Sequence, residues 1–138
     1  MGLLNFLKRD RNKKITITTS IGEFYFLEID GTKNYQGKVK SKINDDIEVL
    51  FPINDDSISE YQINYFKKIE NSWISILKQI STQKPDIHFM DYTVVSILIP
   101  DKGNKFYDVD AEIVIQKEES VFSLIMADLN VDEIIEPS

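Results

Sequence analysis

Three carboxylates alternate along one stretch of the chain, in the pattern Asp108-x-Asp110-x-Glu112. If this stretch is a strand, the three side chains share one face and successive members lie about 7 Å apart. That spacing is too wide for all three to bind one small ion directly, so Mg²⁺ or Ca²⁺ would need oxygen ligands from elsewhere. The pattern alone does not define a metal site, and we predict none.

Other roles for these carboxylates involve solvent or a protein partner. Lys38, Lys40 and Lys42 alternate along an earlier stretch, so a solvated acidic face could pair with this basic stripe. The carboxylates could also form half of a protein-binding patch, in which complementary charge accelerates association and selects the partner. Such a patch needs no precise geometry, and two further acids extend it. The residues that we predict to contact a partner are Asp108, Asp110, Glu112, Glu118 and Glu119.

The sequence contains none of the motifs that would indicate an enzyme. His88 is the only histidine, so neither a site with two histidine ligands nor a Ser-His-Asp grouping can be built without relying on this residue alone. The absence of cysteine excludes thiolate ligands, a cysteine nucleophile and disulfides. No G-x-S-x-G, G-x-G-x-x-G or P-loop pattern occurs. We therefore predict a non-enzymatic protein that needs no cofactor.

Composition indicates one acidic folded domain over residues 1–138. A hydrophobic fraction of 42% and 15 aromatic residues (8 Phe, 6 Tyr, 1 Trp) exclude a disordered chain. The net charge of −7 argues against nucleic-acid binding, which requires a clustered positive surface. It suits either a basic protein partner or solubility alone. The lack of cysteine suits a reducing cytoplasm, and no apolar run approaches the ~20 residues that span a membrane.

The two ends of the chain differ in charge. Residues 1–14 hold five basic residues against one acid, after a short apolar run. This segment could rest on a membrane or a partner as an amphipathic helix, but we favour a segment that caps the domain's own core. Residues 128–138 form an acidic tail, in which the spacing of Val131, Ile134 and Ile135 suggests one or two helical turns.

Residues 55–83 are predicted to form the one long helix. Ser57 and Glu60 fit a capping box at its start, and Pro85 ends it, because proline disfavours the helical conformation in the preceding residue. Apolar side chains recur at helical spacing and make one stripe that must be buried. The stripe consists of Ile58, Tyr65, Phe66, Ile69, Trp73, Ile76, Leu77 and Ile80.

The remaining segments indicate strands. The pattern predicts them at residues 15–19, 23–29, 35–43, 47–52, 92–99, 107–115 and 121–127. The first four are joined by short turns and should form an antiparallel meander. We therefore predict an α+β fold with an antiparallel sheet of six to seven strands and the helix packed on one face. Residues 23–29 and 92–99 are apolar on both faces, so the second face needs a cover: a terminal segment, a partner chain, or curling of the sheet.

Three features of the sequence form a layout found in other proteins. They are the opening Met1-Gly2-Leu3-Leu4-Asn5-Phe6-Leu7-Lys8, the Ile29-Asp30-Gly31 turn, and a helix with Tyr65 and Trp73 between two groups of strands. This layout resembles that of small bacterial α+β domains of the polymorphic-toxin immunity type, which bind and block a toxin. Related families often carry a His-Gly pair near the final strands, whereas residues 110–127 contain no histidine. No binding residue is therefore carried over. The resemblance implies a cytoplasmic binding protein.

Three functions follow as hypotheses. The first is a non-enzymatic protein-binding module, an immunity-like protein whose acidic surface masks a basic toxin. The second is a structural domain that forms homo-oligomers through its doubly apolar strands. The third is a metal-dependent hydrolase that uses Asp108 and Asp110. We rank them in that order.

Overall fold

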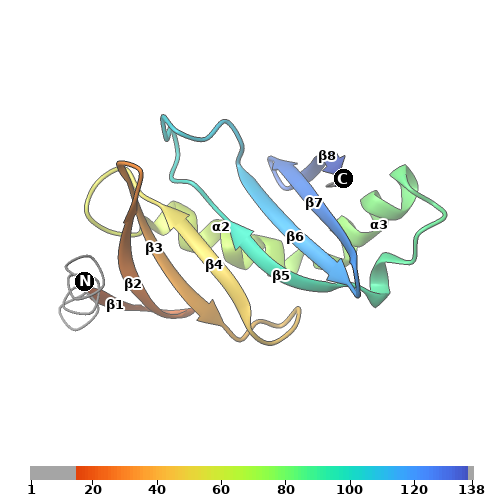
Figure 1. Cartoon of the computed structure of the whole chain (residues 1–138), viewed down its shortest axis with the longest axis horizontal. Coiled ribbons are helices and arrows are strands. Elements are labelled where there is room, and N and C mark those ends of the chain that lie inside the picture. The colour runs from red at the N-terminus through yellow and green to blue at the C-terminus, as the bar shows by residue number, and fades with distance from the viewer. Residues whose placement is uncertain (1–14, 137–138) are drawn as a thin grey trace, which may run out of the picture.

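Eight strands form a single sheet in the order in which they occur along the chain (Figure 1). The computed structural model describes residues 15–136, so the predictions for residues 1–14 and for the last two residues lie outside the described part. Neighbouring strands are antiparallel except β4 and β5, which are parallel. The strands are β1 (Thr16–Thr19), β2 (Gly22–Ile29), β3 (Thr32–Val39), β4 (Ile47–Pro52), β5 (Thr93–Leu98), β6 (Ala111–Lys117), β7 (Ser120–Ala127) and β8 (Asn130–Ile135).

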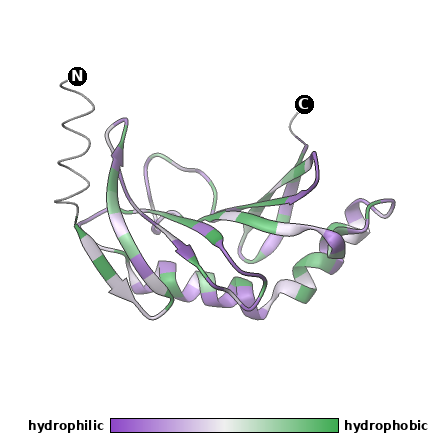
Figure 2. Ribbon diagram, turned by 60° about the horizontal axis from the view of Figure 1, so that its bottom comes forward, coloured by the Kyte–Doolittle hydropathy of each residue, from purple (hydrophilic) through white to green (hydrophobic). Residues whose placement is uncertain are grey.

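The connection from β4 to β5 holds the helices. Helices α2 (Glu60–Asn71) and α3 (Trp73–Gln83) are followed by the short 3₁₀ helix η1 (Phe89–Asp91). A long connection of this kind allows two adjacent strands to run parallel, which a short hairpin turn does not. Both helices lie along one side of the sheet, and the other side is open (Figure 2). The α+β class is thus confirmed, with eight strands in place of six or seven and one parallel pair.

The predicted single helix is divided in two and begins later than expected. The residue that caps α2 is Ser59, whose hydroxyl accepts from the N–H of Gln62, while the Gln62 side chain accepts from the N–H of Ser59. The capping box therefore uses this pair and not Ser57 with Glu60. At Ser72 the backbone leaves helical geometry (φ −103°, ψ 8°), and its N–H donates to the carbonyls of both Lys68 (2.9 Å) and Ile69 (3.2 Å). The predicted end of the helical region at Gln83 is confirmed.

The apolar stripe of the helices packs against one face of the sheet. Six of its eight members are buried, while Ile58 and Trp73 are partly buried against the same core. Alternate residues of the strands meet them from the sheet, which is the pattern expected of a sheet with one covered face. These buried strand residues include Phe24, Val49, Phe51, Ile97, Ile113, Ile115, Phe122 and Leu124.

Residues Asn130–Ile135 of the C-terminal tail form the strand β8, so the predicted helical turns at Val131, Ile134 and Ile135 are wrong. A tight turn with positive φ at both Asp128 (50°) and Leu129 (65°) reverses the chain, and β8 pairs with β7. The mirror-image turn geometry matches the twist of a hairpin but usually carries Gly or Asn. Leu129 gives no such signal. A bulge in the pairing disturbs the strict alternation of β8, which weakens its strand pattern further.

The strand predicted at residues 107–115 begins only at Ala111 and continues to Lys117. Residues 99–110 form an irregular connection from β5 to β6. Asp108 and Asp110 therefore precede the strand, and the three alternating carboxylates do not share one strand face as predicted. The third predicted strand also shifts, to Thr32–Val39, so Lys40 and Lys42 lie beyond its end.

The helices also protect one edge of the sheet. On the outer strand β8, the N–H of Val131 donates to Gln79 (2.7 Å) and its carbonyl accepts from Gln83 (3.2 Å). The two glutamines are four residues apart on α3, so they lie on the same face of the helix. They occupy backbone groups that another strand would otherwise pair with.

Candidate functional site

The face of the sheet opposite the helices is not covered by any described helix or strand (Figure 2), although Asn34 and Pro52 at one end of it are buried. Successive side chains of a strand point to opposite faces of the sheet. The residues next to the core residues Phe24, Val49, Ile97 and Ile113 therefore lie on the open face. One row of paired residues crosses it from β2 to β8: Tyr25, Gln36, Leu50, Leu98, Glu112, Ile125 and Glu133.

The centre of this open face is aliphatic. Leu50 and Leu98 are direct neighbours on the parallel strands β4 and β5, and Val114 on β6 is diagonal to Leu98, opposite Ser96. All three are half-buried, and no described helix or strand packs on them. Two carboxylates border this centre, Glu48 on β4 and Glu112 on β6. An apolar centre with charged groups around it is the anatomy of a protein–protein contact surface.

The two bordering carboxylates differ in their partners. Glu48 accepts a hydrogen bond of 2.7 Å from the side chain of Gln36. Glu112 has no hydrogen bond or ion pair with any residue in the range 15–136. Within that range the one salt bridge joins Lys117 to Asp91, so the predicted pairing of the acidic stretch with the lysine stripe does not form. Glu112 is thus available to a basic group from outside.

The five carboxylates predicted to contact a partner are divided between the two ends of β6. Asp108, Asp110 and Glu112 lie at its start, whereas Glu118 and Glu119 form the turn after it. The seven residues of β6 separate the two groups by roughly 20 Å. Only Glu112 lies on the open face itself. Among the described residues, no group of three or more potential ligands could hold a metal ion.

Asp110 belongs to a corner where α2 meets the turn between β7 and β8. Its carboxylate accepts from the N–H of Asp128 (2.7 Å), and the hydroxyl of Tyr65 accepts from the N–H of Leu129 (3.1 Å). Burial raises the pKa of Tyr65 to about 12; the Leu129 hydrogen bond opposes this, and the negative charge of Asp110 adds to it. Burial, followed by Asp110 and Asp101, also raises the pKa of Tyr61. These hydrogen bonds connect α2 and the segment before β6 to the turn between β7 and β8.

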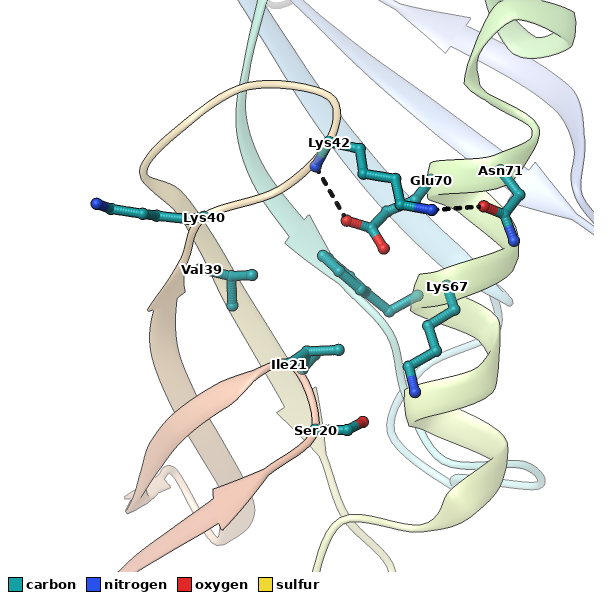
Figure 3. Close-up of a pocket in the computed structure, with 9 residues that line it drawn as sticks. Ser20, Ile21, Val39, Lys40, Lys42, Lys67, Glu70 and Asn71 are labelled. Atoms are coloured by element: carbon teal, nitrogen blue, oxygen red, sulfur yellow. Dashed lines mark hydrogen bonds between the residues drawn. The ribbon is translucent and has the colours of Figure 1, made fainter.

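A polar groove lies on the other side of the sheet, between α2 and the turn that joins β1 to β2 (Figure 3). It has a volume of about 360 Å³. A second hollow of about 440 Å³ adjoins it towards the start of α2, and the two share Ser20 and Lys67. The residues that line the first hollow are Ser20, Ile21, Val39, Lys40, Lys42, Phe66, Lys67, Glu70 and Asn71.

Hydrogen bonds hold one end of this groove. The Glu70 carboxylate accepts from the Ser41 hydroxyl (2.7 Å) and from the Lys42 N–H (3.2 Å), and the Lys42 ammonium donates to Asn71 (3.3 Å). Lys40 points away from the helix, whereas Lys67 extends from α2 into the space beside Ser20 (Figure 3). Lys67 makes no hydrogen bond or ion pair with a described residue.

The carboxyl ends of the parallel strands, where α/β proteins often bind ligands, are filled by Gln62. Its amide donates to the carbonyls of Pro52 (2.7 Å) and Ile99 (2.9 Å), and the side chain is fully buried. The exposed His88 precedes η1, away from this position, and gathers no catalytic partners among residues 15–136.

Comparisons of this chain with protein families, with curated proteins and with solved structures find no match. In the described range, no helix has the length and apolar character needed to cross a membrane. Function must therefore be argued from the two surfaces. The doubly apolar strands at residues 23–29 and 92–99 did signal the open face. The groove was missed, because Lys67 lies on a polar helix face that sequence alone does not place beside Ser20.

Proposed function

We propose that this protein is a non-enzymatic protein-binding module whose contact surface is the open face of the sheet. The observation that carries the proposal is the aliphatic centre of Leu50, Leu98 and Val114, on which no described helix or strand packs. Glu112 borders this centre, and its carboxylate has no hydrogen bond or ion pair within residues 15–136. Burying such a centre against a partner removes apolar surface from water, which is the main favourable contribution to association.

The size of the face is sufficient for a specific complex. Eight strands spaced by about 4.8 Å span roughly 34 Å, and a strand of six to eight residues is roughly 20–26 Å long. A standard interface takes about 800 Å² from each partner, which this area can supply.

The charge of the face selects the kind of partner. Glu23, Glu48, Glu112 and Glu133 lie on it against the single lysine Lys38, a formal charge of −3. Pairing the face with that of a second copy would bring like charges together, whereas a basic surface would be attracted. The partner is therefore a protein that presents apolar and basic side chains, and complementary charge raises its association rate.

This partner chemistry supports the more specific proposal of an immunity-type protein that masks a basic toxin. In this arrangement Glu112 is a central contact, and Asp108, Asp110, Glu118 and Glu119 lie towards the two ends of β6, where they add long-range attraction. The self-associating domain is the competing proposal, since the same apolar face could in principle bury itself.

Capture experiments with three full-length baits test the proposal in a lysate of the source cells. The wild type should retain a basic protein that high salt releases, because salt screens charge attraction. The double variant Glu48→Lys/Glu112→Lys should lose it. The matched control Asp55→Lys/Asp86→Lys makes the same charge change at exposed positions in the connections before α2 and after α3, and should retain it.

Three results would contradict the proposal. One is equal capture by all three baits, and another is capture that depends on Asp55 and Asp86 instead of the sheet face. The third is a concentration-dependent dimer of the wild type in light scattering that the double variant abolishes, which would favour self-association.

A further inference from the structure

The groove between α2 and the turn joining β1 to β2 is a second surface, separate from the open face. Its floor is apolar, formed by Ile21, Val39 and Phe66, and its rim is polar. The groove is partly open to solvent, and its volume of about 360 Å³ falls in the range of sites that bind small molecules. A protein partner on the open face would leave this groove free, because the sheet lies between them.

The local charge of the groove is opposite to that of the molecule. Three lysines line it against one carboxylate, in a chain whose net charge is −7. Glu70, the one acid, already accepts hydrogen bonds from Ser41 and from the backbone of Lys42. A concave site whose lining has a net positive charge attracts an anionic ligand.

Two groups reach into the groove from opposite walls. Lys67 extends from α2, and the side chain of Ser20 points from the turn towards the helix (Figure 3). No hydrogen bond joins them, and Lys67 has no partner among residues 15–136. An ammonium and a hydroxyl that converge without bonding each other can both donate to the oxygens of one anion. Lys42 lies at the other end of the same hollow, where its ammonium donates a hydrogen bond to Asn71.

We propose that this groove binds a small organic phosphate ester. The phosphate oxygens accept from Lys67 and Ser20, and the organic part rests on the apolar floor of Ile21 and Val39. Lysine suits this ligand because its ammonium acts as a point charge on a tetrahedral anion, whereas a planar carboxylate is better matched by the fork of an arginine, which the groove lacks. The limited volume and the acidic surroundings exclude a nucleic-acid polymer.

Titration of the ¹⁵N-labelled full chain at constant ionic strength tests this site. Phenyl phosphate should shift the amide signals of residues 20–21, 40–42 and 67–71 in a saturable way. Inorganic phosphate should bind the same residues more weakly because it lacks the apolar part, and phenol should leave them unchanged because it lacks the charge. Lys67→Gln should weaken phenyl phosphate binding roughly tenfold, the loss expected for one charge-assisted hydrogen bond.

Lys38→Gln is the matched control, since it removes one exposed lysine from the opposite face of the sheet and should leave affinity unchanged. Ser20→Ala, at an exposed turn, should weaken binding by a smaller factor. Shifts that do not saturate, equal losses in Lys67→Gln and Lys38→Gln, or equal binding of inorganic phosphate and phenyl phosphate would overturn the proposal. The result is independent of the sheet-face proposal, because no residue is shared.

Discussion

At the scale of single residues, Gln62 joins three parts of the fold. Its oxygen accepts from the N–H of Ser59 at the start of α2, and its amide donates to the last carbonyls near the ends of β4 and β5. A buried polar group is tolerated only when its hydrogen bonds are made, and here they are. The Gln62 side chain thereby holds the start of α2 next to the ends of the parallel strands β4 and β5.

Replacing this amide by a carboxyl group gives a pH-dependent prediction. In Gln62→Glu, a carboxylate would face the two carbonyls of Pro52 and Ile99 while fully buried, so its folded pKa is raised above the unfolded value. Stability is then largely retained below pH 4 and falls as pH rises. At pH 7 we expect a loss of at least about 2 kcal/mol in urea unfolding.

The variant Asn64→Asp is the control, because Asn64 is exposed on the same helix and the same amide-to-carboxyl change there should leave the pH profile of the wild type unchanged. Equal stability of Gln62→Glu at pH 4 and pH 7 would show that residue 62 is not enclosed in this way.

Tyr65 makes a second residue-scale prediction at alkaline pH. Its folded pKa of about 12 lies above the ordinary value of 10, so the folded state keeps its proton where the unfolded chain has lost it. This stabilisation is complete below pH 10 and is lost as pH rises towards 12. Urea unfolding between pH 9 and pH 11.5 should show a fall in the wild type that is shallower in Tyr65→Phe.

Tyr61 contributes in the same direction, so some slope should remain in Tyr65→Phe. At pH 7 that variant should lose about 1 kcal/mol, because the N–H of Leu129 loses its acceptor. Identical alkaline slopes in wild type and variant would contradict the assignment.

At the scale of elements, α3 blocks the outer edge of β8. If Gln79 and Gln83 were both replaced by alanine, the N–H and carbonyl of Val131 would become open to another strand. We expect a loss of about 1–2 kcal/mol in urea unfolding and faster hydrogen exchange at the Val131 amide. Light scattering should also detect association, since unprotected edges pair.

Lys78→Ala is the control for this prediction, because Lys78 is exposed on the same helix and does not reach the edge. Unchanged exchange at Val131 in the glutamine double variant would show that the edge is not held by these side chains.

The elements also show what sequence can predict. Strands with clear alternation or β-branched runs, such as residues 15–19 and 121–127, were found nearly in full, as were the buried stripe and the helix end before Pro85. The strand β8 was missed because its turn uses Asp128 and Leu129 in a conformation that usually carries glycine. The break between α2 and α3 at Ser72 was not predicted, because no glycine or proline occurs there.

The site was predictable only in part, because it depends on strand neighbours. Sequence showed that strands at 23–29 and 92–99 had a second apolar face, but not that Leu50 and Leu98 lie side by side, which requires the parallel pairing of β4 with β5. The acidic set was selected by closeness in sequence, and β6 separates its members. Glu48 was overlooked because its importance comes from the strands around it.

At the scale of the whole molecule, we expect charge to oppose self-association of the apolar face. Glu48 and Glu112 border the aliphatic centre, so replacing both by leucine would create a continuous apolar patch. We expect the double variant to form concentration-dependent dimers or larger species in light scattering, while the wild type remains monomeric. Asp86→Leu/Glu119→Leu, with the same change at exposed positions off the face, should behave as the wild type.

The most direct test of the account is a methyl NMR spectrum of the labelled protein with its captured basic partner. The account predicts that the signals of Leu50, Leu98, Val114 and Ile125 shift or broaden, because they lie on the open face. The exposed Ile74 on α3 and the buried Ile113 serve as internal references and should remain unchanged. Perturbation centred on Ile74, with the four open-face signals unaffected, would contradict the sheet face as the contact surface.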